Sequence, residues 1–173
     1  PGSRMSTMPE LIQLVYASLG SQDYETAGNV VKTLKNSQLV GDTVIRSFPE
    51  GMFVEDSPLV GSLGVVRQGY KKLEARLGSH QEREVVFSDD RKLRFVPYGF
   101  QTGSRETAHE LEENSGIIAL AGSQENAGKL AGVSNLYQEN PYFLTPRPTE
   151  RPETSVAELF SRGLYDRLYI NIS

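Results

Sequence analysis

The sequence predicts an α+β fold, in which a helical hairpin and further helices pack on a small, mainly antiparallel sheet. Three observations lead to this prediction. Two helical patterns follow each other closely within residues 7–37, large apolar residues recur every three or four positions within residues 59–77, and polarity alternates within residues 84–98 around a polar turn. A chain of 173 residues is long enough to bury one sizeable core.

The first helix is predicted to begin at Thr7, because Thr7 and Glu10 have the spacing of a capping box. Gly20 is expected to end this helix in the left-handed conformation. An alternative is that residues 12–18 form a strand and that the turn after them leads into a helix. The N-terminus of that helix would then suit an anion or a flavin phosphate, as in flavodoxin-like folds. The capping box and the helical spacing favour the helix, whose apolar face would be Leu11, Leu14, Val15 and Leu19.

The second helix is expected to follow at once, with Ser21 as its N-cap and with Asp23 and Glu25 near its positive end. Its predicted apolar face consists of Tyr24, Ala27, Val31 and Leu34. Because the connection is so short, the two helices should run antiparallel with their apolar faces in contact.

Two strands and a long helix are predicted next. Residues 43–48 and 52–54 read as strands around a turn at 49–51. Ser57 and Pro58 are suited to begin a helix that Gly78 would end. The glycines inside it indicate either a close backbone neighbour or a later start. One apolar stripe would run along it: Leu59, Leu63, Val66, Tyr70, Leu73 and Leu77.

A β-hairpin is predicted from residues 84–87 and 92–98, with one buried and one wetter face. Pro97 lacks a ladder donor, which indicates an edge strand. A short surface helix is predicted from Ser104 or Arg105 to Glu113. The apolar run at residues 115–122 is interpreted as a central buried strand, with a helix as the alternative that its length leaves open. Ser123 is predicted to cap a small helix that reaches about Val133.

The C-terminal part is expected to begin with an extended, proline-containing connection over residues 135–152, anchored by Tyr137, Tyr142, Phe143 and Leu144. Ser155 and Glu158 have capping-box spacing, so a last helix is predicted through Leu168, followed by a strand over residues 169–172. The expected organisation is a tag or disordered start at 1–6, where residues 1–4 resemble an expression remnant, and a single α+β domain over 7–173.

Composition excludes several classes of protein. A formal charge of −4 and a pI near 5.3 make nucleic acid an unlikely partner. The chain has no cysteine, which removes disulfides, thiolate metal sites and cysteine nucleophiles, and weakly favours a reducing, cytoplasmic location. No apolar run approaches the roughly 20 residues that a membrane helix needs.

Catalytic, metal and cofactor motifs are not recognised. The two histidines, His80 and His109, lack the i, i+4 pairing of a zinc-protease helix, so the acidic residues after His109 are expected to form a solvated helix face. Ser62 lies in a sequence that misses the nucleophile-elbow pattern, and packing explains it better. No phosphate-binding glycine motif occurs. We therefore predict no catalytic residue, no metal site and no cofactor, and lean towards a protein that is not an enzyme.

Two sets of residues are candidate binding sites. The first is a basic cluster that could bind an anion or an acidic partner, although it also fits a solvated helix flank: Arg67, Lys71, Lys72 and Arg76, with Arg83 nearby. The second is an apolar, tyrosine-rich tail that could pair with the chain's own sheet or with a neighbour's edge: Tyr165, Leu168, Tyr169, Ile170 and Ile172.

We therefore expect a non-enzymatic interaction or assembly module that contacts another protein, or itself as a homo-oligomer, through a helical face or a sheet edge. The alternative is a small-molecule or anion-binding domain, or an enzyme, with a site built from carboxylates, tyrosines and arginines. Such sites leave no local motif in the sequence.

Overall fold

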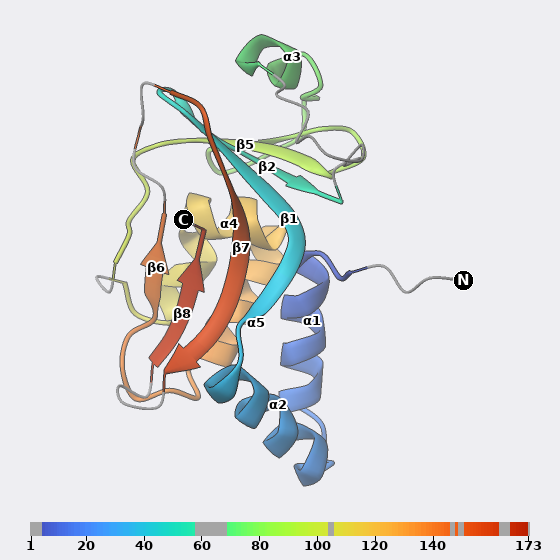
Figure 1. Cartoon of the computed structure of the whole chain (residues 1–173), viewed down its shortest axis with the longest axis vertical. Coiled ribbons are helices and arrows are strands. Elements are labelled where there is room, and N and C mark those ends of the chain that lie inside the picture. Colours follow the sequence, from blue (N-terminus) through green and yellow to red (C-terminus); the bar gives the residue numbers. More distant parts are fainter. Residues whose placement is uncertain are drawn as a thin grey trace.

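The computed structural model describes residues 5–57, 69–103, 106–145, 148, 151–162 and 167–172, and within these it confirms the α+β class. Helices pack on an eight-stranded sheet (Figure 1). The strands are β1 (Leu39–Phe48), β2 (Gly51–Asp56), β3 (Gln81–Glu82), β4 (Val85–Phe87), β5 (Leu93–Pro97), β6 (Tyr142–Leu144), β7 (Glu153–Arg162) and β8 (Arg167–Asn171). The helices are α1 (Met8–Leu19), α2 (Tyr24–Asn36), α3 (Tyr70–Glu74), α4 (Ser115–Ala121), α5 (Gln124–Ser134) and the 3₁₀ helix η1 (His109–Glu113).

The sheet has the strand order β3-β4-β5-β2-β1-β7-β8-β6, and all its pairs are antiparallel except β6 with β8. Figure 1 shows α4 and α5 behind β1, β7 and β8, with α1 and α2 beside them. The main core lies between these helices and the sheet. A smaller aromatic core lies near α3, where Phe48, Phe53, Leu73 and Leu93 pack together.

The start of α1 is as predicted: Thr7 is the N-cap, and Thr7 and Glu10 form both hydrogen bonds of a capping box. Residues 12–18 are helical, so the flavodoxin-like alternative is wrong. The expected left-handed end is also wrong, because Gly20 has a φ of −82°. Three residues of α1 reach the core: Met8, Ile12 and Val15.

Helix α2 begins two residues later than predicted, because the Asp23 carboxylate, and not the Ser21 hydroxyl, accepts from the N–H groups of Glu25 and Thr26. The expected apolar face is only partly correct. Leu34 is fully buried, but Tyr24, the first residue of α2, is 91% exposed.

The β1–β2 hairpin is confirmed, with Ile45 opposite Val54 and Phe48 opposite Gly51 at the turn. The predicted five-turn helix that follows is wrong as one continuous helix. Gly69 has extended backbone (φ −68°, ψ 159°) and is the N-cap of the short α3, so any helical stripe is interrupted there. Residues 58–68, which include Ser62 and Arg67, lie outside the described part of the chain.

The β4–β5 hairpin is confirmed, but β5 is not an edge strand, because it pairs with β2 as well as with β4. Pro97 is tolerated since β4 pairs only as far as Phe95, which leaves no partner strand at Pro97 on that side. The prediction that one face of this hairpin is more exposed to solvent is also wrong. Leu93 packs in the small core, and Arg94 and Val96 are buried on the opposite face.

Residues 115–122 form a helix and not the predicted central strand. Every residue of α4 is buried, so the sequence shows no amphipathic period. The true signals are the Asn114 side chain, which accepts from the Ile117 N–H, and Gly122, which ends α4 in the left-handed conformation (φ +80°). The cap of α5 at Ser123 is as predicted.

The predicted last helix is wrong, because residues 153–162 form β7 and pair along β1 and β8. Ala157, Leu159 and Ser161 are buried towards the helices, as the two-residue period of a strand requires. The Ser155 hydroxyl donates to the Ile172 carbonyl and caps nothing. The predicted strand over 169–172 corresponds to β8, which starts two residues earlier.

Candidate binding groove beside strand β6

The most distinctive surface of the described chain lies beside β6, the terminal strand of the sheet. Across the open edge of β6, the N–H of Gly103 donates to the Phe143 carbonyl at 2.7 Å and the N–H of Phe143 donates to the Gly103 carbonyl at 2.9 Å. Gly103 takes a left-handed conformation there (φ +81°), which a glycine tolerates best. The loop over residues 98–103 is thereby held alongside the strand.

A groove of about 370 Å³ lies between this loop and β6, and we refer to it as the β6 groove. Its lining combines four aromatic rings with two threonine hydroxyls and glycine backbone, and none of the described lining residues is charged. These residues are Tyr98, Gly99, Phe100, Thr102, Gly103, Tyr142, Phe143, Leu144, Thr145 and Pro148. Concave sites of this volume that mix apolar walls with a few polar groups are typical of ligand binding.

Helix α4 supports the aromatic wall of the groove. The rings of Phe100 and Phe143 stack with their centroids 5.9 Å apart. Gly116 in α4 leaves the room they need, since a Cβ atom there would lie 2.6 Å from the Phe100 ring and 2.9 Å from the Phe143 ring. The helix cap holds the loop in the same place, because the Asn114 side-chain amide donates to the Gln101 carbonyl at 2.9 Å.

The same amide of Asn114 also donates to the Glu106 carboxylate at 2.5 Å. Burial raises the pKa of Glu106, with a further upward contribution from Glu110, against the lowering effect of the Asn114 hydrogen bond. Burial likewise raises the pKa of Tyr98. The Ser47 hydroxyl partly opposes this increase, and the negative charge of Glu153 adds to it. The Tyr98 phenol and the carboxyl group of Glu106, which contacts the loop through Asn114, therefore both hold their protons more tightly than usual.

Some backbone N–H groups of the loop are not used in hydrogen bonds within the described part of the chain. In the described part of the chain, the N–H groups of residues 99–102 donate to no protein acceptor. Gly99, Gln101 and Thr102 are exposed residues, and Phe100 is half-buried. The loop is bent at Phe100 and is not a strand, but its open backbone donors lie beside aromatic side chains. Such donors can form hydrogen bonds with the backbone of another chain, whose side chains then enter the groove.

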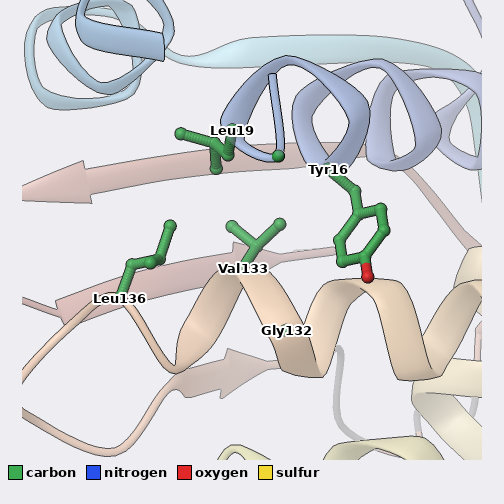
Figure 2. A pocket seen from close by; sticks show the side chains of 6 residues that line it. Tyr16, Leu19, Gly132, Val133 and Leu136 are labelled. Atoms are coloured by element: carbon green, nitrogen blue, oxygen red, sulfur yellow. The ribbon is translucent and has the colours of Figure 1, made fainter. Parts of the chain in front are cut away.

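A second, smaller groove of about 190 Å³ lies between the C-terminal ends of α1 and α5, and we call it the α1–α5 groove. Figure 2 shows Tyr16 and Leu19 pointing from α1 towards α5, with Val133 and Leu136 on the opposite side. Tyr16 lies against Gly132, where a Cβ atom would be 2.9 Å from its ring. Tyr16 and Leu136 are 45% and 59% exposed.

The structure places the predicted tail residues mainly in the core. Leu168, Ile170 and Ile172 are fully buried, because they face the helices, so their side chains form no surface. Tyr169 lies on the other face of the sheet, half-buried between Phe160 and Tyr142, with ring centroids 5.2 and 5.7 Å away. Strand β8 lies between β7 and β6 and is therefore not an edge. Tyr165 lies outside the described residues.

The predicted basic cluster is only partly assembled. Lys71 and Lys72 are exposed on α3, but Arg76 pairs with Glu55 at 2.6 Å, and Glu55 also pairs with the buried Arg46 at 2.5 Å. Arg83 pairs with Glu113 at 2.8 Å. These carboxylates offset much of the positive charge on which the anion-site hypothesis depends.

Each histidine lies beside a glutamate. His80 lies 3.2 Å from Glu82, and His109 is largely exposed 3.6 Å from Glu112. Over the described ranges, no three acidic or histidine side chains are arranged to hold a metal ion. No described helix is both long enough and apolar enough to cross a membrane.

The β6 groove was not predicted. Of its lining residues, the sequence analysis singled out Tyr142, Phe143 and Leu144, but only as anchors for the connection. The anchoring prediction is confirmed for Phe143, which is buried. The signal that could have drawn attention to the loop is the pair Gly99 and Gly103, which flank the short segment 100–102 and both have positive φ.

Comparison with known proteins adds information on the fold. No protein-family model matches the sequence, and no curated protein matches it. A solved structure described as "Accommodation of massive sequence variation in Nanoarchaeota by the C-type lectin fold" is similar, with a TM-score of 0.59 and 11% identity over 99% of this chain and 83% of that chain. At that identity the similarity concerns the fold alone, and the fold of this chain is similar to the C-type lectin fold.

Proposed function

We propose that this protein is a non-enzymatic interaction module that binds an extended segment of another protein in the β6 groove. The observation that carries the proposal is the combination of an uncharged, aromatic groove with the open backbone donors of residues 99–102 along its side. Backbone hydrogen bonds would supply affinity, and the pockets between rings would select side chains.

Two further observations support this proposal. The similar nanoarchaeal structure is described as a fold that accommodates massive sequence variation, and a scaffold that tolerates surface change is well suited to recognition. Both ends of the sheet are also short: β3 has two residues, and β6 has three and is already bridged by Gly103. Short edges discourage unspecific strand pairing, which favours the loop and groove as the place of contact.

The proposal is tested with random linear peptides selected by display against the full chain. Their affinity is then measured for the wild type, for Thr102→Arg and Thr145→Arg in the groove, and for Thr33→Arg on the exposed side of α2 as a matched control. We expect the groove variants to weaken binding at least tenfold and the control to leave it unchanged. Equal binding by all variants, or a selection that yields no binder, would contradict the proposal.

Self-association is the second form that an interaction module can take. Light scattering after size-exclusion chromatography, at low and high protein concentration, measures it directly. A dimer that Thr102→Arg dissociates would identify a second copy of the chain as the partner at this groove. A dimer that this variant leaves intact would place self-association elsewhere.

A further inference from the structure

The α1–α5 groove has an electrostatic character that its apolar lining does not reveal. Successive contacts lie closer to the C-terminal end of both helices. The Gln13 side-chain amide donates to the Asn126 side-chain oxygen, Tyr16 lies against Gly132, and Leu19 lines the groove with Leu136. The helices therefore run side by side with the same polarity. Their C-terminal ends, each equivalent to about half a negative charge, meet at the groove.

The last turns of the two helices and the segments that follow them supply no basic residue to offset these ends. Neither α1 nor α5 has a basic side chain in its last turn, and residues 17–23 and 131–139 contain no Lys, Arg or His. Helix C-termini in proteins are usually complemented by such cations. The charged residues in these two segments are Asp23 and Glu139, which are acidic, and Glu139 pairs with Arg167 of β8.

Backbone carbonyl groups of the lining residues are also left open. Among the described residues, the carbonyl oxygens of Leu19 and Gly132 accept no hydrogen bond. Both residues line the groove, where Leu136 and Tyr16 expose apolar surface. A ligand that suits this place presents an apolar group to Tyr16, Leu19 and Val133 and a cationic donor to the helix ends.

We propose that the α1–α5 groove is a second docking site, for a partner protein segment in which an aromatic or aliphatic side chain is next to a lysine or arginine. The apolar side chain fills the roughly 190 Å³ between the two helices. The ammonium or guanidinium group donates to the open carbonyls and complements the two helix ends. This site is separate from the β6 groove and does not depend on it.

The test uses three probe peptides that differ in one residue: acetyl-Ala-Phe-Lys-Ala-amide, its Gln counterpart and its Glu counterpart. Each is titrated into the ¹⁵N-labelled full chain and followed by NMR. The proposal predicts shifts centred on Tyr16, Gly132 and Leu136, with the Lys peptide binding at least threefold tighter than the Gln peptide and the Glu peptide weakest.

Two variants isolate the electrostatic part. Ala17→Lys places a cation in the last turn of α1 at an exposed position and should remove the advantage of the Lys peptide over the Gln peptide. Ala75→Lys, at the exposed end of the distant α3, should leave that advantage unchanged (Figure 1). The proposal is overturned by equal affinities of the three peptides in the wild type, by an advantage that survives Ala17→Lys, by absence of binding, or by shifts centred elsewhere.

Discussion

Gly116 of α4 lies directly against Phe100 of the groove loop, so closely that a Cβ atom on Gly116 would be 2.6 Å from the Phe100 ring. This approach links the buried helix to the surface loop. Because Phe100 also stacks on Phe143 of β6, one glycine in the core determines how the aromatic wall of the β6 groove is arranged. The packing of α4 and the shape of the candidate site are therefore coupled.

Substitution of Gly116 tests this coupling. Gly116→Ala should lower the free energy of unfolding by about 1–3 kcal/mol, as overpacked cores do, and should displace the Phe100 and Phe143 rings. Chemical denaturation measures the first effect, and aromatic NMR shifts measure the second. Gly128→Ala in α5 is the matched control, because its Cβ would meet only Glu112 at an ordinary 3.5 Å, and it should stabilise the helix by about 0.5–1 kcal/mol. A neutral Gly116→Ala would show that the wall is not constrained by α4.

The buried ion pair of Arg94 with Asp56 should be a strong determinant of stability. The Arg94 side chain is 1% exposed and makes two hydrogen bonds to the Asp56 carboxylate, one of them at 2.9 Å. Arg94→Met removes the cationic partner of that carboxylate, which keeps a hydrogen bond from the Thr43 hydroxyl, and removing one member of a buried pair costs about 3–5 kcal/mol. Urea denaturation measures the loss, and the exposed neighbour Lys92→Met should change stability by less than about 0.5 kcal/mol. A loss no larger than that of the control would contradict the assignment.

Glu82 should make stability sensitive to acid. Although burial alone raises its pKa, hydrogen bonds from the Gln124 N–H, Arg91 and His80 hold the pKa of Glu82 below its ordinary value. A carboxylate with a lowered folded-state pKa stabilises the fold above its unfolded pKa, and this contribution is lost as the pH falls through the folded pKa. Glu82→Gln should therefore flatten the loss of stability on acidification below about pH 4.3, the ordinary Glu value. Denaturation curves at a series of acidic pH values measure the slope, and an unchanged slope would refute the prediction.

Glu106 should behave in the opposite way. Burial raises its pKa, so the folded state favours the protonated form, and stability from this group is present at low pH and lost as the pH rises through the folded pKa. Glu106→Gln keeps a carbonyl that can accept from Asn114, and it should make the protein more stable at pH 7 but not at pH 4. Stability of both forms at these two pH values is the measurement. A destabilised variant at pH 7 would mean that the Asn114 amide requires the charge.

The elements that were predicted correctly have local causes. The capping box of Thr7 and Glu10, the Ser123 cap and the turn before Gly51 each involve residues only a few positions apart. A local sequence pattern is therefore sufficient to predict them. The errors arise where tertiary packing decides. The run at residues 115–122 is buried all round and shows no period, and the spacing of Ser155 and Glu158 resembled a capping box although both lie on a strand.

The candidate site could not be predicted from sequence patterns, for a related reason. Phe100, Gly116 and Phe143 are far apart in the chain, and tertiary contacts bring them together: the bridge between Gly103 and Phe143 and the hydrogen bond from Asn114 to the Gln101 carbonyl. The tail residues were selected because they are apolar and tyrosine-rich, which describes a core strand as well as a binding surface. Distinguishing the two requires knowledge of which face of β8 the helices cover.

Amide hydrogen exchange over residues 99–102 tests the central claim most directly. The N–H groups there have no acceptor within the described chain, so they should exchange fast in the free protein. If a peptide selected by display lies along the loop, as proposed, the exchange of several of these amides should slow markedly on binding. If the peptide binds and these amides exchange as fast as before, the partner backbone does not pair with the loop, and the proposed mode of recognition is wrong.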